Sequence, residues 1–333
     1  MPVRDEQTHL RSAVGRVLDQ AYPGPLEVIL AVGPSTDDTA ALAADLATAD
    51  SRVRVVANPS GSTPVGLNLA LGVSSHPVVV RVDGHGLLGP GYIGRAVGEL
   101  ERTGAANVGG VMDAVGTTDF ERAVARAMTS RLGIGGASFH TGGAAGPADS
   151  VYLGVFRRSV LEELGGFDEH YRRAQDWELN LRIRQAGHTV WFDPGLSVTY
   201  RPRAGWRALA RQFHGSGRWR RELVRRHPGT ASPRYLAPPV VTTLVLGGTV
   251  TGLLGAILAR RGPSGSATAA RAARLTLAAP LSYALGVVTA ATVSGRGLPP
   301  RSRIVLPGVL ATMHICWGLG FLVGVSPDLT QSS

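Results

Sequence analysis

The sequence predicts an α/β domain, with a mostly parallel sheet flanked by helices, followed by helices that cross a membrane. Three short segments rich in β-branched residues recur at intervals of about 25 residues near the start of the chain, and this spacing is typical of βαβ units. Three long runs without a charged residue then occupy the last third of the chain. A parallel sheet and a membrane domain are therefore expected in this order.

The first part of the chain supplies the expected sheet and a candidate ligand pair. Strands are expected at 26–33 (LEVILAVG), 52–58 (RVRVVAN) and 77–82 (PVVVRV), and Leu10, Val14, Val17 and Leu18 fall on one face of an expected helix. Ser35 or Thr36 is expected to cap the helix after the first of these strands. Ligands of open parallel sheets bind beyond the carboxyl ends of the strands. Asp83 and His85 follow such an end, so they are candidate ligands, with a plain strand-ending turn as the alternative.

The last third of the chain is expected to enter a membrane. Its charge-free runs are 237–259, 276–293 and 304–325, and each is near the roughly 20 residues that span a bilayer. The hydrophobic content of 44% is also high for a wholly soluble protein. Burial in a soluble core is the alternative for any single run, but three in succession favour membrane helices.

A basic segment, residues 201–226, precedes these runs. It contains nine of the chain's arginines and one acid, Glu222. Nucleic acid is disfavoured as a partner because the segment adjoins an apolar run and no nucleic-acid motif is present. Trp206 and Phe213 belong to an apolar stripe, which fits an interfacial helix on an anionic leaflet. The positive-inside rule then predicts a multi-pass protein of the cell membrane with its α/β domain in the cytoplasm.

A further helix is expected within residues 172–192. Asp176 and Glu178 lie at its start, Leu179 and Ile183 are on its apolar side, and Gly187 ends it. Acidic residues in a first turn also favour the helix dipole, so this pair alone does not indicate catalysis.

Several motifs in order carry a family resemblance. They are PVRDEQTHLRSAV, GPSTDDT, TPVGLNLAL, VVRVDGHG, NVGGVM, DSVYLGVFRRSVLEELGGFDE, AQDWELNLRIRQAG, QFHGSGRW and HICWGLGFLVG. Each is weak alone, but their order resembles the family 2 glycosyltransferases with the GT-A fold. Among these the chain is similar to the membrane-anchored succinoglycan-biosynthesis subgroup.

The resemblance implies a reaction and a set of site residues. A nucleotide-diphosphate sugar would lie over the strand ends, and a divalent cation, Mn²⁺ or Mg²⁺, would be held by Asp83 and His85 in place of the usual Asp-x-Asp. Asp176 would be the general base. Implied donor-binding residues are Pro2, Arg4, Glu6, Ser35, Asp37, Asn68 and Asp83. Implied acceptor or pyrophosphate residues are Arg157, Gln175, Trp177, Gln212, Arg218 and Trp219.

The chain departs from the family pattern at three places. Val32-Gly33 replaces the acidic pair that usually meets the nucleoside. Gln212 is separated from Arg218-Trp219 by five residues, a spacing that favours single-sugar transfer over polymerisation. The family's complete first strand should end near the position of Met1, so we expect this strand to be truncated.

We therefore expect a GT-A catalytic domain at residues 1–230, including the basic segment, and a membrane domain at 237–325. The expected activity is inverting, metal-dependent transfer of one sugar from a nucleotide-diphosphate sugar to a membrane-associated acceptor or to a polysaccharide or glycolipid acceptor. One alternative is a non-catalytic, membrane-anchored sugar-binding or scaffold protein with a decayed site. Another is a membrane transporter or assembly subunit.

Overall fold

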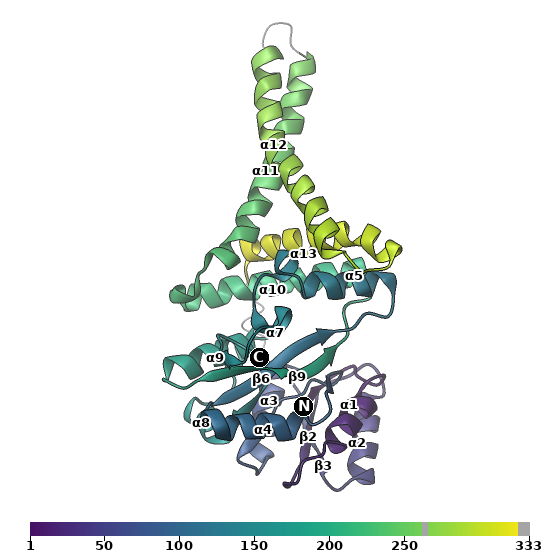
Figure 1. Ribbon diagram of the computed structural model, residues 1–333, viewed down its shortest axis with the longest axis vertical. Helices are drawn as coiled ribbons and strands as arrows, with labels where there is room; N and C mark the ends of the chain where they lie inside the picture. The colour runs from purple at the N-terminus through teal and green to yellow at the C-terminus, as the bar shows by residue number, and fades with distance from the viewer. Residues whose placement is uncertain (262–265, 326–333) are drawn as a thin grey trace. The chain divides into compact units, whose positions relative to one another are not determined.

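The computed structural model describes residues 1–261 and 266–325, which form two compact units (Figure 1). The first unit contains Met1–Val115 and Gly136–Arg201. The second contains Gly116–Gly135 and the described part of Pro202–Pro327.

The first unit begins with a three-stranded parallel sheet in the order β1-β2-β3. Its strands are β1 (Pro2–Val3), β2 (Val28–Val32) and β3 (Val53–Ala57), and its helices are α1 (Leu10–Leu18), α2 (Thr39–Ala49) and α3 (Thr63–Val73). Helices α1 and α2 lie on one face of this sheet and α3 on the other (Figure 1). Each connection between parallel strands is a right-handed crossover. The chain moves from β1 to β2 to β3 in one direction across the sheet and then turns back, so the helix after β3 lies on the opposite face from α1 and α2.

A second, mixed sheet completes the first unit. Its strand order is β4-β8-β6-β9-β5, β7 pairs with β9, and only the β6–β9 pair is parallel. The strands are β4 (Val78–Val80), β5 (Leu87–Leu88), β6 (Asn107–Ala114), β7 (Gly146–Pro147), β8 (Tyr152–Arg157) and β9 (Val190–Tyr200). The helices are α4 (Tyr92–Thr103), α7 (Ser138–Thr141), α8 (Arg158–Glu163) and α9 (Gln175–Gln185).

Most elements expected in this unit are confirmed. The three expected strands contain β2, β3 and β4, and Leu10 and Val14 of α1 are fully buried in the core. The start of α2 is different, because the helix begins at Thr39 rather than after Ser35 or Thr36. The Asp37 carboxylate accepts from Thr39 N at 3.0 Å and thereby orders the residues before the helix.

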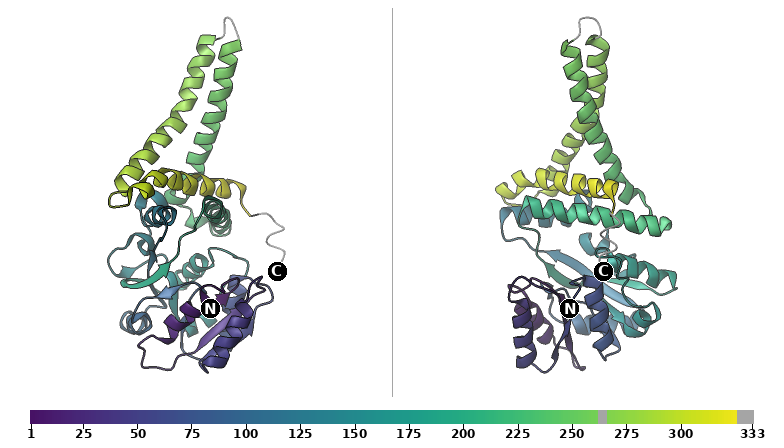
Figure 2. Two further views of the ribbon diagram at one scale, coloured as in Figure 1. Left: turned by 90° about the vertical axis from the view of Figure 1, so that its right-hand side faces the viewer. Right: turned by 180° about the vertical axis from the view of Figure 1, so that it is seen from behind.

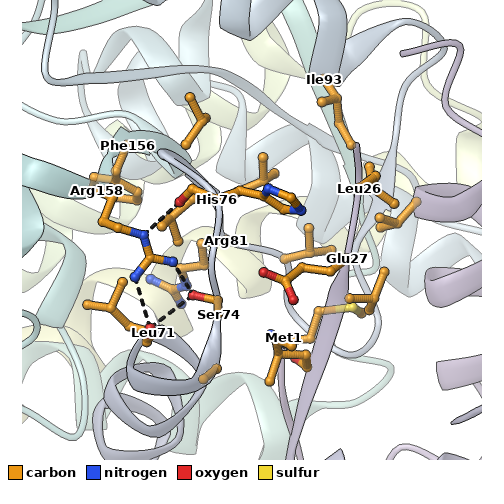
Figure 3. Close-up of a pocket in the computed structure, with 18 of the residues that line it drawn as sticks. Met1, Leu26, Glu27, Leu71, Ser74, His76, Arg81, Ile93, Phe156 and Arg158 are labelled. Atoms are coloured by element: carbon orange, nitrogen blue, oxygen red, sulfur yellow. Dashed lines mark hydrogen bonds between the residues drawn. The ribbon is translucent and has the colours of Figure 1, made fainter. Parts of the chain in front are cut away.

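An apolar cavity of about 240 Å³ lies in the first unit (Figure 3). Aliphatic side chains of β2 and β4 line it together with Met1, whose backbone nitrogen donates to Ile29 O at 2.8 Å. Arg158 is held beside it by bonds to the His76 and Leu71 carbonyls and to the Ser74 hydroxyl. Because the lining is mainly aliphatic, this cavity is poorly suited to a charged pyrophosphate.

The second unit is entirely helical in its described part. It consists of α5 (Asp119–Met128), α6 (Arg131–Ile134), α10 (Trp206–Arg226), the 3₁₀ helix η1 (Pro228–Thr230), α11 (Pro233–Arg261), α12 (Ser266–Ser294) and α13 (Pro300–Val323). Helices α11 and α12 pack together, and α13 packs against α10 and α5 (Figure 2). The structure therefore groups α5 and α10 with the apolar helices, whereas the sequence analysis assigned them to the catalytic domain.

Three helices of this unit are long and apolar enough to cross a membrane. The candidate spans are Pro233–Ile257, Leu275–Ser294 and Pro300–Val323. Only 11% of the apolar window is buried in each of the first two, against 33% in the third. The third helix thus has a different environment from the other two.

Candidate active site

Two chain segments meet at the carboxyl ends of the strands in the first unit. Glu6 follows β1 and His85 follows β4, and Oε1 of Glu6 lies 2.6 Å from Nδ1 of His85. Gly84 permits this approach, because a Cβ at this position would lie 2.9 Å from Cγ of Glu6. The strand-end residues that were expected to meet a ligand are therefore brought together by backbone geometry.

A buried arginine joins the two principal carboxylates of this region. The Arg81 side chain is only 5% exposed; its Nη2 lies 3.1 Å from Oδ1 of Asp83 and its Nη1 lies 2.5 Å from Oδ1 of Asp176. Burial alone would lower the pKa of Arg81, but the charges of Asp176 and Asp83 outweigh it and raise the pKa. Arg81 therefore remains a cation that fixes both carboxylates.

The backbone before α9 places Asp176 at this site. Ala174, the N-cap residue, has a φ of 64°, a left-handed conformation that is uncommon for alanine and is concentrated at functional sites. Asp176 follows two residues later and is 29% exposed. Glu178 instead points into the protein, where it is 2% exposed and binds Arg182 through both carboxylate oxygens. The two acids therefore have different environments.

The turns after β1 and β2 are tied to each other by polar side chains. Asp5 accepts from Thr36 N at 2.7 Å, and its own backbone nitrogen donates to the Ser35 hydroxyl at 3.1 Å. Asp37 accepts from Gln7 N at 3.1 Å. Ser35 and Asp37 were expected to bind the donor, and their contacts here hold the loops at the edge where the donor would lie.

Basic and phenolic groups surround the carboxylates. Partial burial and then the charge of Arg201 lower the pKa of His9, which also interacts with Glu6 and His85. Burial, followed by the charge of Asp83, raises the pKa of Tyr152 well above its usual value. A neutral Tyr152 hydroxyl and the cations Arg81 and Arg201 are suited to an anionic ligand.

The residues at the strand ends also fit a divalent cation that shares its coordination with phosphate. Mg²⁺ in such sites typically uses one or two carboxylates together with substrate phosphates and water. At Asp83 such a cation would share the carboxylate with Arg81, which contacts its Oδ1. A carboxylate on one ring nitrogen, as Glu6 is on His85, orients a histidine to bind metal through the other. Among residues 1–261 and 266–325, no group of three or more His, Cys, Asp or Glu side chains is arranged to hold a metal ion.

The remaining residues predicted for the site of the first unit have other visible contacts. Asn68 forms two hydrogen bonds with the Phe167 backbone, each of 2.8 Å. Arg157 donates to the carbonyls of Ala105 and Leu100, near the end of α4. These contacts supply structural roles, and binding roles for the two residues stay predictions. The same holds for Pro2 in β1, for Arg4, which is half exposed beside Asp5, and for Gln175 and Trp177 in the first turn of α9.

Three predicted residues, Gln212, Arg218 and Trp219, lie on α10 in the second unit. Gln212 accepts from Arg203 Nε at 3.2 Å, Arg218 donates to Gly324 O at 2.5 Å, and Trp219 is 7% exposed. These contacts are internal to the second unit. The acceptor role of the three residues stays a prediction.

Sequence reasoning missed Arg81 and Tyr152. Arg81 interrupts an apolar strand segment, VVVRV, and a charge in such a run needs a buried partner. This signal could have identified Arg81 as a site residue. Tyr152 carries no comparable signal, because an aromatic residue at the start of a strand is ordinary.

Comparisons with known proteins agree with the fold. Residues 1–165 match the family model described as Glycosyl transferase family 2. Succinoglycan biosynthesis protein ExoA of Rhizobium meliloti (strain 1021) is 32% identical over 250 residues, which cover 74% of this chain and 76% of that protein.

Solved structures to which the chain is similar include S. aureus TarS 1-349, at 13% identity and a TM-score of 0.48, covering 96% of this chain and 88% of that one. The TarS complex with UDP-GlcNAc has 13% identity and a TM-score of 0.49, with 96% and 89% covered. GalNAc-T7 with UDP, GalNAc and Mn²⁺ has 13% identity and a TM-score of 0.45, with 58% and 41% covered. By its 32% identity to ExoA over 74% of this chain and 76% of that one, together with the family model over residues 1–165, this chain belongs to the family 2 glycosyltransferases.

Proposed function

We propose that this glycosyltransferase moves a single sugar from a nucleotide-diphosphate donor to a lipid-linked or glycan acceptor at a membrane, with inversion at the anomeric carbon. The observation that carries the proposal is the joint engagement of Asp83 and Asp176 by the buried Arg81. This contact sets a carboxylate from a strand end beside a carboxylate from a helix start. The reaction requires one group on the donor side and one on the acceptor side.

Asp176 is the proposed general base. As the acceptor oxygen attacks the anomeric carbon, its proton passes to the Asp176 carboxylate, and the bond from that carbon to the phosphate oxygen breaks. The nucleoside diphosphate leaves with the bonding electrons, so one in-line displacement inverts the anomeric centre. Arg81 orients Asp176 for this transfer through the 2.5 Å contact. A positioned general base typically contributes a factor of about 10²–10⁴.

Asp83 and His85 are the proposed ligands of a divalent cation, with Glu6 orienting the His85 ring. A cation held there would offset the negative charge of the pyrophosphate. The positive charge of Arg201, which lies near enough to His9 to lower its pKa, supports binding of the same anion. The name of the relative ExoA, a succinoglycan biosynthesis protein, supports a role in polysaccharide assembly.

The location is proposed to be the cytoplasmic face of the cell membrane, with a multi-pass anchor. The apolar helices of the second unit and the nine arginines of residues 201–226 support this arrangement.

Asp176→Asn tests the proposed base. The substitution removes the basic oxygen but keeps size and polarity, so turnover at saturating donor and acceptor should fall by at least about 10²-fold. Donor affinity and thermal stability should stay near those of the parent. Turnover within a few-fold of the parent would exclude Asp176 as the base. A parent that binds the donor but neither transfers nor hydrolyses it with Mn²⁺ would favour the non-catalytic alternative.

A further inference from the structure

Both ends of α13 are fixed to helices that precede α11 in the chain. At its start the buried Ser302 donates to Oδ1 of Asp119, the first residue of α5, at 2.8 Å. At its end Arg218 of α10 donates to Gly324 O at 2.5 Å, and Arg221 donates to the Phe321 and Leu322 carbonyls. Cationic side chains commonly satisfy the carbonyls that a helix end leaves unpaired. The contacts at both ends therefore involve segments made before the first candidate span.

Between its ends, α13 runs beside α10 (Figure 2). Glycines bring the two backbones together: a Cβ at Gly217 would collide with Trp317 O, and one at Gly320 would collide with His214 O. Earlier along both helices, Gly308 lies against the Trp206 ring. Trp206, Gly217 and Arg221 follow one another along α10, and their partners Gly308, Trp317 and Leu322 follow in the same order along α13, so the two helices are parallel neighbours over much of their length.

Helix α10 is unsuited to the interior of a bilayer. It contains seven arginines within Trp206–Arg226, and each arginine at the centre of a membrane helix costs about 2.5–3.5 kcal/mol even on the most favourable scale. A helix packed lengthwise against α10 must share its depth. The high hydropathy of α13 does not require that the helix cross the bilayer. One apolar face of α13 is covered by α10 and α5, and a second face is exposed, with Ile304 79% exposed.

Helices α11 and α12 have the opposite character. Over residues 237–257 and 275–294 they carry no charged side chain, and apolar side chains there face outward, with Val250 57% and Leu285 69% exposed. The pair also starts and ends near segments that precede it. Arg220 of α10 stacks 4.2 Å over the Tyr235 ring at the start of α11, and Arg126 of α5 donates to Ser294 O at the end of α12 at 2.7 Å. A hairpin that leaves one membrane face and returns to it satisfies both contacts.

We propose that the chain crosses the bilayer twice, through α11 and α12, and that α13 lies in the membrane surface alongside α10. The partner of the exposed apolar face of α13 is then the acyl region of one leaflet, and the arginines of α10 meet the anionic headgroups of that leaflet. Arg296, Arg301 and Arg303 fall on the same side as the nine arginines of residues 201–226, against four arginines beside the α11–α12 connection (260, 261, 271 and 274), so the larger number lies on one side, as the positive-inside rule requires. The proposal replaces the three spans expected from hydropathy with two.

The first test is the sidedness of single cysteines in a Cys316→Ala background, with a membrane-impermeant maleimide applied to sealed inverted vesicles and to spheroplasts. The positions are Arg296→Cys between α12 and α13, Val323→Cys at the end of α13, and Ser264→Cys between α11 and α12. Arg296→Cys and Val323→Cys should react from the same side and Ser264→Cys from the opposite side. Reaction of Val323→Cys from the side of Ser264→Cys would show that α13 crosses. Reaction of all three from one side would show that the hairpin does not.

The second test measures depth with nitroxide labels in vesicles of anionic lipid. Ile304, Ala311 and Leu322 lie on one face of α13, because 18 residues complete five turns. Equal depths at these three positions are expected. A crossing helix would instead place Ala311 about 10 Å deeper than Ile304, at 1.5 Å per residue, and that profile would overturn the proposal. The matched series on α11, Val240, Gly247 and Leu254, should be deepest at Gly247, and a flat profile there would reject the hairpin.

Discussion

Replacing Arg81 with methionine tests the electrostatic centre of the proposed site. Methionine keeps an unbranched chain of similar length but removes the cation that lies 3.1 Å from Asp83 and 2.5 Å from Asp176. If Arg81 had a purely structural role, its replacement would weaken both ligand binding and the transfer rate of the protein. The proposed role of Arg81 predicts instead that the affinity for a divalent cation increases while the transfer rate falls.

The magnitude follows from the charge that a cation must compete with at Asp83. Two unit charges 3.1 Å apart attract by about 1.3 kcal/mol at the permittivity of water and by more at a partly buried site. Because Arg81 is 5% exposed and Asp83 is 23% exposed, the value in water is a lower bound. Removal of Arg81 should therefore tighten Mn²⁺ binding by at least about tenfold. Transfer should slow by about 10²-fold, the usual cost of a misplaced catalytic group.

Electron paramagnetic resonance of free Mn²⁺, titrated with protein in the absence of nucleotide at low ionic strength, measures the affinity directly. Transfer at saturating donor and acceptor measures the rate, and circular dichroism with thermal unfolding checks the fold. Arg81→Lys is the matched control, since it keeps the charge and should leave Mn²⁺ affinity near that of the parent. Weaker or unchanged Mn²⁺ binding in a folded Arg81→Met protein would refute the reasoning.

Three further substitutions separate stability from chemistry. Glu178→Gln should lower the free energy of unfolding in urea by roughly 2–4 kcal/mol, because it leaves the buried Arg182 pair incomplete, yet change turnover of the folded enzyme less than twofold; a 10²-fold loss would move the base to Glu178. Arg95→Met should destabilise the protein by about 2 kcal/mol, since Asp193 is 2% exposed and bonded to Arg95 at 2.6 and 2.9 Å. Burial alone would raise the pKa of Asp193, but the Arg95 hydrogen bonds lower it. The difference in unfolding free energy between the parent and Arg95→Met should therefore be constant above about pH 5 and shrink as the pH falls below about 4. A pH-independent difference would contradict the proposed pairing of Arg95 with ionised Asp193. His85→Asp should retain transfer and shift the preference from Mn²⁺ toward Mg²⁺ in activity titrations with the two metals, and an unchanged metal profile would remove His85 from the ligands.

The sequence was sufficient for the features that depend on local pattern. Short apolar runs predicted β2, β3 and β4, and apolar residues spaced to lie on one helix face predicted α1. This helical spacing is required to bury one face of a helix, wherever in the fold the helix lies. The same reasoning placed Asp176 at a helix start and Asp83 beyond a strand end. It took Asp176 and Glu178 together as acids of one first turn, whereas the structure buries Glu178 against Arg182.

Tertiary structure decided which of these residues meet. No local pattern pairs Arg81 with Asp176 or Glu6 with His85, since each pair is joined only when separate elements reach the same sheet edge. The position of α13 was equally hidden from the sequence. Length and hydropathy are the same for an apolar helix that crosses lipid and for one that packs along a neighbour, because both remove apolar surface from water. The proposal that α13 packs along α10 rests on the contacts of Ser302 with α5 and of Arg218 with the end of α13, and such contacts exist only in the folded chain.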